Sequence, residues 1–150
     1  MKMNKKIVLM LFTLASLILL PVSMKADDKP IRFEQLPKVA QQFVKNHFSS
    51  EVSYVTVDND LIGKSYEVTL VDGTRIEFDR KGIWKDVDVE QGVVPSKIVP
   101  RSISNYVMKN FPGTTIKQIE KRDRGGYQVE LSNGLELKFN SKLQFVRMDD

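Results

Sequence analysis

Residues 66–78 read YEVTLVDGTRIEF, and residues 127–139 read YQVELSNGLELKF, so one pattern occurs twice in the chain. In each copy, apolar and polar residues alternate on both sides of an Asp-Gly or Asn-Gly dipeptide. The alternation predicts strands with one buried face, and the dipeptides favour the two-residue turn of a β-hairpin. The sequence therefore predicts two equivalent hairpins, 61 positions apart.

The segments around the hairpins also correspond. Each hairpin is preceded by apolar residues at helical spacing, which are Leu36, Val39, Ala40, Phe43, Val44 and Phe48 in the first copy and Val99, Ile103, Tyr106, Val107 and Phe111 in the second. Pro37 and Pro100 fit the first turn of the two helices. Further strands are predicted at 52–57, 83–89, 115–120 and 143–148, whereas residues 27–30 are polar and are expected to be irregular.

The predicted fold class is α+β: a tandem repeat of a helix followed by a four-stranded antiparallel meander. The repeats span 27–90 and 91–150, and together they form a single structural domain. We expect the two units to join into one antiparallel sheet with both helices on one face, although packing of the two helical layers would also bury the exposed surface. The open face would carry Glu67, Thr69, Arg75 and Glu77, then Gln128, Glu130, Glu136 and Lys138. Glu67 or Thr69 would pair with Arg75 across the strands.

Residues 1–26 are predicted to be a signal peptide. Three lysines precede an apolar stretch at 7–20, which is shorter than the roughly 20 residues that a membrane-spanning helix needs. We place cleavage after Ala26, with cleavage after Ser23 and an uncleaved anchor as the alternatives. The expected location is the periplasm or the exterior, without membrane attachment after cleavage.

Charge and cysteine usage exclude several classes of function. Removing residues 1–26 removes four lysines and no acidic residue, which leaves 19 basic and 19 acidic residues. A neutral chain is a poor candidate for nucleic-acid binding, which needs a basic surface. No cysteine occurs, so disulfides, thiol catalysis, thiolate metal sites and a lipobox are all excluded.

The chain resembles the PepSY-like, β-lactamase-inhibitor-like family of exported bacterial proteins over essentially the whole segment after residue 26. The resemblance lies in the two hairpins and in Leu36-Pro37, Val99-Pro100, Phe48, Phe111-Pro112-Gly113 and Trp84-Lys85-Asp86-Val87-Asp88. It implies export, a duplicated α+β fold, and a role in binding or inhibiting another protein. It brings no catalytic motif, and Phe48-Ser49-Ser50 departs from the Phe-Pro-Gly of the second copy.

The residues themselves predict no enzyme, cofactor or metal site. His47 is the only histidine, and no Gly-x-Ser-x-Gly motif accompanies any serine. Asp58-Asn59-Asp60 followed by Gly63 resembles a calcium loop, but Ile62 and Thr69 stand where oxygen ligands are needed. A turn is therefore the better interpretation of this segment.

We hypothesise a non-enzymatic exported binding protein that engages a protein partner, such as a hydrolase, through the open sheet face and hairpin loops. The candidate contact residues are Glu67, Thr69, Asp72, Gly73, Arg75, Glu77 and Trp84. Turn chemistry alone would also explain Asp72 and Gly73, and a core role would explain Trp84, since Phe145 replaces it in the second copy. The alternative is a small-ligand or cation sensor module that uses Asp58, Asp60, Asp86 and Asp88.

Overall fold

The structure is a computed structural model that describes residues 28–61 and 63–150. The predicted signal peptide, residues 1–26, lies outside the described residues. Along the described chain the elements are β1 (Lys29–Ile31), the short 3-10 helix η1 (Phe33–Gln35), α1 (Lys38–His47), β2 (Val52–Asp60), β3 (Gly63–Leu70), β4 (Arg75–Phe78), β5 (Trp84–Asp88), α2 (Arg101–Asn110), β6 (Ile116–Lys121), β7 (Tyr127–Leu131), β8 (Glu136–Phe139) and β9 (Phe145–Asp149).

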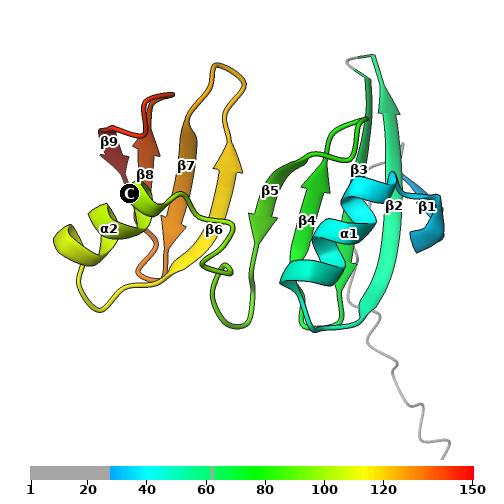
Figure 1. Ribbon diagram of the computed structural model, residues 1–150, viewed down its shortest axis with the longest axis horizontal. Helices are drawn as coiled ribbons and strands as arrows, with labels where there is room; N and C mark the ends of the chain where they lie inside the picture. Colours follow the sequence, from blue (N-terminus) through cyan, green and yellow to red (C-terminus); the bar gives the residue numbers. More distant parts are fainter. Residues whose placement is uncertain (1–27, 62) are drawn as a thin grey trace, which may run out of the picture.

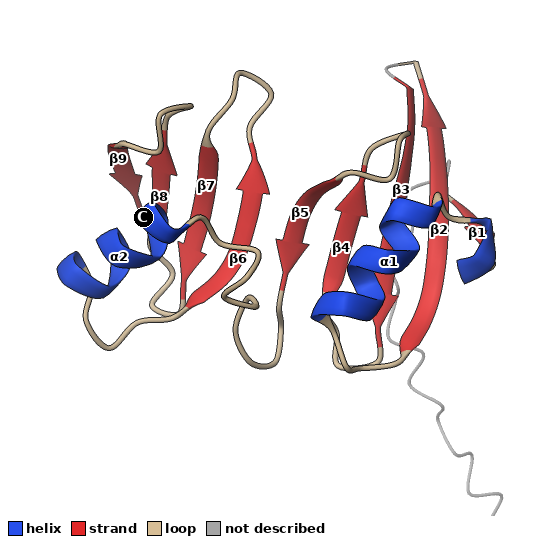
Figure 2. Ribbon diagram, viewed as in Figure 1, coloured by secondary structure: helices blue, strands red, loops and turns tan. Residues whose placement is uncertain are grey.

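One antiparallel sheet organises the described part of the chain. Its nine strands follow one another in sequence order, from β1 at one edge to β9 at the other. Both helices lie on the same face of this sheet, with α1 over the first strands and α2 over the last (Figure 1). No helix of the described residues lies behind the sheet, on its opposite face (Figure 2). The predicted α+β class and the single sheet are confirmed.

The two helices begin directly after Pro37 and Pro100, which therefore occupy the N-cap positions instead of the first turn. Ala40 and Val44 of α1 are buried, as are Ile103 and Val107 of α2. The prediction that Val39 belongs to the buried face of α1 is wrong, because its side chain is 50% exposed.

Gln41 takes a buried place in α1 that a simple apolar pattern does not predict. Its Nε2 atom donates hydrogen bonds to the carbonyl oxygens of Leu36, at 2.9 Å, and Glu34, at 3.1 Å. These bonds satisfy the amide inside the protein, so its burial carries little penalty. They also hold η1 against the start of α1.

A continuous apolar layer lies between the sheet and the helices. The strand register places Ile76 opposite Val87, Val87 opposite Ile119, and Ile119 opposite Val129. All four side chains are fully buried. The helices contribute aromatic rings to this layer: Phe43 of α1 meets Phe78 edge-on at 5.7 Å, and Tyr106 of α2 meets Phe139 at 5.5 Å. The layer therefore continues without interruption across the β5–β6 pairing.

The turns before β5 and β9 share one hydrogen-bond pattern. Asp79 Oδ1 accepts from the backbone N–H groups of Lys81 and Ile83. Asn140 Oδ1 accepts in the same way from Lys142 and Gln144. An acidic or amide side chain in this position stabilises the turn by bonding to the backbone two residues later.

The prediction that residues 27–30 are irregular is wrong for Lys29 and Pro30. Lys29–Ile31 form β1, in which Lys29 pairs with Val57 and Ile31 with Val55. β1 covers the outer edge of β2 over these residues, and a covered edge removes unpaired backbone groups from that side of the sheet.

Gly82 sets the distance between α1 and the sheet. A Cβ atom on Gly82 would lie 2.7 Å from Cβ of Pro37 and 3.1 Å from the backbone nitrogen of Ala40. Gly113 has the same φ of +80°, but nothing lies within 4 Å of its Cβ position.

Replacing Gly82 with alanine should therefore destabilise the protein more than the matched change Gly113→Ala. Both variants incur about 1 kcal/mol for placing alanine in the left-handed region. Only Gly82→Ala also pushes α1 away from the turn before β5, which should lower the free energy of unfolding by about 2 kcal/mol more. Urea unfolding of both variants measures the difference, and equal losses would contradict this account of the helix packing.

Candidate interaction surface

The face of the sheet away from the helices carries polar side chains from neighbouring strands. Alternation along each strand produces this arrangement, because burial of one face leaves every second residue on the other. In the register, Glu67 of β3 lies opposite Glu77 of β4, Glu77 opposite Asp86 of β5, and Asp86 opposite Glu120 of β6. Four carboxyl groups therefore form one line across four strands, which we call the acidic row.

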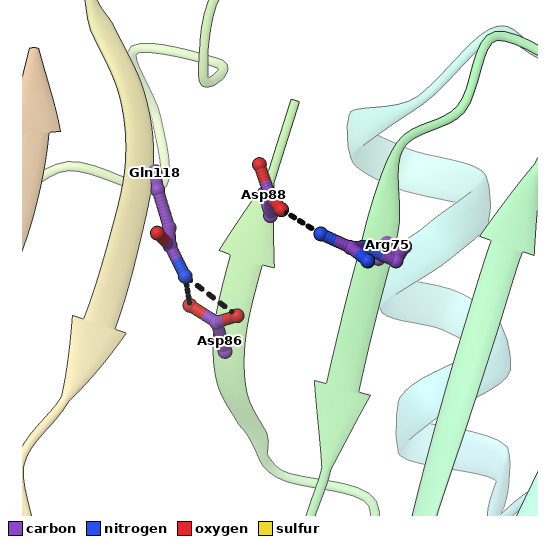
Figure 3. Close-up of polar contacts among 4 residues, drawn as sticks. All are labelled: Arg75, Asp86, Asp88 and Gln118. Carbon is purple, nitrogen blue, oxygen red and sulfur yellow. Dashed lines mark hydrogen bonds and ion pairs between the residues drawn. The ribbon is translucent and has the colours of Figure 1, made fainter. Parts of the chain in front are cut away.

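A second line of residues, with no net charge, lies beside the acidic row. It runs from Thr69 of β3 through Arg75 of β4 and Asp88 of β5 to Gln118 of β6. Arg75 forms an ion pair with Asp88, and Gln118 Nε2 donates to both carboxylate oxygens of Asp86, at 3.0 Å each. Figure 3 shows these contacts side by side on β4, β5 and β6.

The expected cross-strand pairing of Arg75 with Glu67 or Thr69 is confirmed for Thr69. Thr69 does lie directly opposite Arg75 in the register. Arg75 also forms an ion pair with Asp88 on the next strand, and the charge of Glu67 attracts it as well. Asp88 attracts Arg75 more strongly than Glu67 does, and its hydrogen bond is the main cause that raises the pKa of Arg75. This pair joins β4 to β5 on the open face.

The part of the face formed by β7, β8 and β9 has a more balanced charge. Gln128 donates to Glu136 at 3.0 Å, and Asp149 forms ion pairs with Lys138 and with Arg147. The hydrogen bond from Lys138 lowers the pKa of Asp149. The open face is thus acidic across β3 to β6 and mixed toward β9.

Asp86 is the most perturbed carboxyl group of this surface. Its pKa is raised from 3.8 to about 6, mainly by burial; the Gln118 hydrogen bond opposes the shift, and the nearby charges of Glu77, Glu120 and Asp88 add to it. Burial favours the neutral acid because it removes water from the charged form, and like charges act in the same direction. Burial and the neighbouring carboxylates of the acidic row therefore both favour the neutral form of Asp86.

The structure brings together only part of the predicted contact set. Glu67, Thr69, Arg75 and Glu77 lie together on the open face. Trp84 lies on the helix side instead, where its ring stacks on Phe43 at 6.0 Å and the Lys121 ammonium lies 4.0 Å from the ring centroid. Trp84 is therefore placed to join α1 to the sheet, apart from the other candidates.

The two hairpin tips differ in their surroundings. At the first tip, Asp72 Oδ1 accepts from the backbone N–H of Thr74, at 3.0 Å. The carboxyl group of Glu90 lies against Gly73, where an added Cβ would be only 2.1 Å from it. Nothing lies within 4 Å of the Cβ position of Gly134 at the second tip. The second tip is therefore more open than the first.

The four aspartates of the cation hypothesis do not form one cluster. Asp58 and Asp60 belong to β2, whereas Asp86 and Asp88 belong to β5, and β3 and β4 lie between these strands. Asp60 Oδ1 accepts from the backbone N–H of Gly63, which is the contact of a turn. Among the described residues, no group of three or more Asp, Glu or His side chains is arranged to hold a metal ion.

Gln118 and Glu120 were not among the predicted contact residues, although both belong to this surface. Alternation around Ile119 could have placed them on the polar face, although Ile116 breaks the period-two pattern before Gln118. Their alignment with Asp88 and Asp86 depends on the pairing of β5 with β6, which alternation within one segment does not specify.

An open hollow of about 470 Å³ lies at one end of this face. Its lining comes from several turns and strand ends, and includes Asp60, Lys64, Glu77, Lys81, Lys85 and Asp123. Lys85 and Asp123 form an ion pair of 3.8 Å across the hollow's margin. The lining mixes both signs of charge, so the hollow extends the polar surface without a single ligand preference.

Replacing Asp86 with asparagine should stabilise the protein at neutral pH and not in acid. The folded-state pKa lies above the ordinary value, so ionisation between pH 3.8 and about 6 lowers stability as the pH rises. After allowance for solvent screening, the gain at pH 7.5 should be about 1 kcal/mol. At pH 3.5 the folded state holds the proton and the unfolded state mostly does, so the gain should largely vanish.

The matched change Asp88→Asn should not raise the free energy of unfolding at pH 7.5, because it removes the carboxylate that forms an ion pair with Arg75. Urea unfolding of the three proteins at both pH values measures the effect. A gain for Asp86→Asn that is equal at the two pH values would contradict the electrostatic explanation.

Comparison with known proteins places the chain in a family. The model of the family described as "Putative beta-lactamase-inhibitor-like, PepSY-like" matches residues 64–147. Among curated proteins, none is significantly similar to this chain. Within residues 28–61 and 63–150, neither helix has the length and apolar character needed to cross a membrane.

Solved structures from two Bacteroides species are similar over most of the chain. A "putative periplasmic protein" of Bacteroides vulgatus ATCC 8482 is 41% identical, with a TM-score of 0.79, over 85% of this chain and 100% of its own. A "putative calcium-regulated periplasmic protein" of Bacteroides thetaiotaomicron is 43% identical, with a TM-score of 0.79, over 83% and 98% of the two chains. A second periplasmic protein of Bacteroides vulgatus ATCC 8482, "of unknown function", is 37% identical, with a TM-score of 0.77, over 82% and 99%. The chain therefore belongs to the β-lactamase-inhibitor-like, PepSY-like family.

Proposed function

We propose that this protein is a non-enzymatic binding protein of the cell envelope that holds a protein partner on its open sheet face. The observation that carries the proposal is the acidic row, Glu67, Glu77, Asp86 and Glu120, displayed on a face that neither α1 nor α2 covers. A row of like charges attracts a surface of opposite charge and guides its approach. The partner should therefore present a basic surface, as a hydrolase bound by an inhibitor-like protein could.

The open face is suited to recognition because its side chains are already held in place. Gln118 fixes Asp86 through two hydrogen bonds, and Asp88 fixes Arg75 through an ion pair. Glu77 and Glu120 are exposed beside this arrangement. Side chains that are ordered before binding lose less conformational entropy when a partner docks.

The chemistry of the chain favours binding over catalysis. His47, the single histidine, lies at the end of α1, where its ring is 4.7 Å from the ring of Phe43. It is thus on the helix side, away from the acidic row. The sequence holds no cysteine, and the name of the family refers to inhibition instead of catalysis.

We also infer that the two helix-and-meander units arose as tandem copies, spanning 27–90 and 91–150. The matching register of the two hairpins supports this, since Tyr66 pairs with Phe78 and Tyr127 with Phe139. Residues 1–26 would act as a cleaved signal peptide, which agrees with the periplasmic location named for the similar proteins.

Cation sensing is the second candidate function. The observation that favours it is again the acidic row, in which burial and, to a smaller extent, the neighbouring carboxylates raise the pKa of Asp86, and a protein similar to this one is named a "putative calcium-regulated periplasmic protein". The described residues hold no group arranged as a metal site. A cation would accordingly act as a weakly held counterion of the row, and it would compete with a basic partner.

The test is capture of a partner from envelope extract by the immobilised protein, followed by affinity measurement with the recovered partner. Glu77→Lys should weaken binding about tenfold, because it reverses one charge of the row. The control Glu34→Lys makes the same change at an exposed residue of η1, a helix tied to α1 on the other side of the sheet, and should bind normally.

Each capture is run with calcium and with a chelator, beside thermal melts under the same conditions. Equal binding by the two lysine variants would contradict the proposed surface. Failure to recover a stoichiometric partner, together with a calcium-dependent rise in melting temperature, would favour the sensor function instead.

A further inference from the structure

β9 exposes apolar side chains at the end of the sheet. Phe145 is 37% exposed, Val146 55% and Met148 49%. In the described structure β9 pairs with β8 and is last in the strand order. An edge strand of this kind offers its unpaired backbone groups and its apolar side chains to another strand.

The β5–β6 pairing shows how such an edge is filled within this fold. β5 is the counterpart of β9, and residue 87 corresponds to residue 148 at the 61-residue spacing of the hairpins. Val87 is fully buried because β6 lies beside it, with Ile119 directly opposite. Met148 holds the same position, but no described strand lies on its outer side.

The direction of the backbone groups follows from the same comparison. The Val89 N–H donates to the Lys117 carbonyl at 2.8 Å. In an antiparallel pair, every second residue turns its N–H and C=O toward the same neighbour, so Val87 also faces β6. By this correspondence, the N–H and C=O of Met148 point outward from the edge of the sheet.

The charges around Met148 restrict what can pair with it. Arg147 and Asp149 flank Met148 on the strand and form a mutual contact of 3.3 Å. A complementary antiparallel strand needs an acidic residue opposite Arg147, an apolar residue opposite Met148 and a basic residue opposite Asp149. β9 of a second copy, related by a two-fold axis through Met148, supplies Asp149, Met148 and Arg147 in this order.

We propose that the protein forms a two-fold dimer by antiparallel pairing of β9 with β9 of a second copy, centred on Met148. The axis runs perpendicular to the sheet, so the helices of both copies stay on one side and the open faces become one surface. The contact is self-complementary and therefore closes.

The opposite edge of the sheet is a poorer partner for β9. β1 spans only Lys29–Ile31, and its middle residue, Pro30, has no N–H to donate. Pairing of β9 with β1 of another copy would also be head-to-tail, which gives rings or extended assemblies instead of a two-fold dimer. The same physical argument thus distinguishes the two-fold dimer from a chain of copies.

Sedimentation of the protein, expressed from its full sequence, tests the proposal at concentrations up to about 500 µM. The wild type should approach twice the monomer mass. Met148→Pro removes the outward N–H and should sediment as a monomer. Proline is tolerated in an edge strand, and circular dichroism and thermal melts check that the fold is retained.

Charge exchange provides a test that does not depend on proline. Arg147→Asp places like charges across the two-fold axis twice and should weaken the dimer about tenfold. The double variant Arg147→Asp with Asp149→Arg restores opposite charges and should return the dissociation constant to near the wild-type value. It also leaves an acidic residue at position 147, directly opposite Lys138.

Three results would overturn the dimer: a monomer at every concentration, a dimer that none of the variants weakens, or assemblies larger than two copies. Neither the partner-binding surface nor its affinity test depends on the result, because Glu77 lies on β4 and the dimer contact on β9.

Discussion

The pairing of β5 with β6 is the contact on which the rest of the structure depends. Only three residue pairs make the register, with Val87 opposite Ile119 at its centre. Both of these side chains are fully buried, so the two halves of the sheet, the meanders β1–β5 and β6–β9, share one apolar layer and not two separate cores. Without this pairing, each meander would expose a strand edge and the apolar residues beside it.

The same pairing creates the candidate surface. Burial of Val87 and Ile119 on the helix side places Asp86 opposite Glu120, and Asp88 opposite Gln118, on the other side. Alternation alone would give each meander a polar face. The register between the meanders completes the line of four carboxyl groups and gives Asp86 its amide partner. Fold stability and surface chemistry thus depend on one strand contact.

Much of the fold could be predicted from local sequence, because local rules determine it. Asp72-Gly73 and Asn133-Gly134 identify the hairpins, and alternation correctly assigns residues such as Glu67 and Glu77 to the open face. β1 was missed because three residues that include a proline carry too weak a strand signal, and the edge of β2 provides its hydrogen-bond partners. The partners of Arg75 and Asp86 lie on neighbouring strands whose register is a tertiary property, so sequence periodicity could not identify them.

Native-state hydrogen exchange of the backbone amides tests the shared core most directly. Amides of β3 and β7, which belong to different meanders, should exchange through the same global unfolding as those of β5 and β6. Their opening free energies should then agree to within about 1 kcal/mol. If the amides of β3 and β7 report two clearly different free energies, the meanders unfold independently, and the account of one core joined through Val87 and Ile119 is wrong.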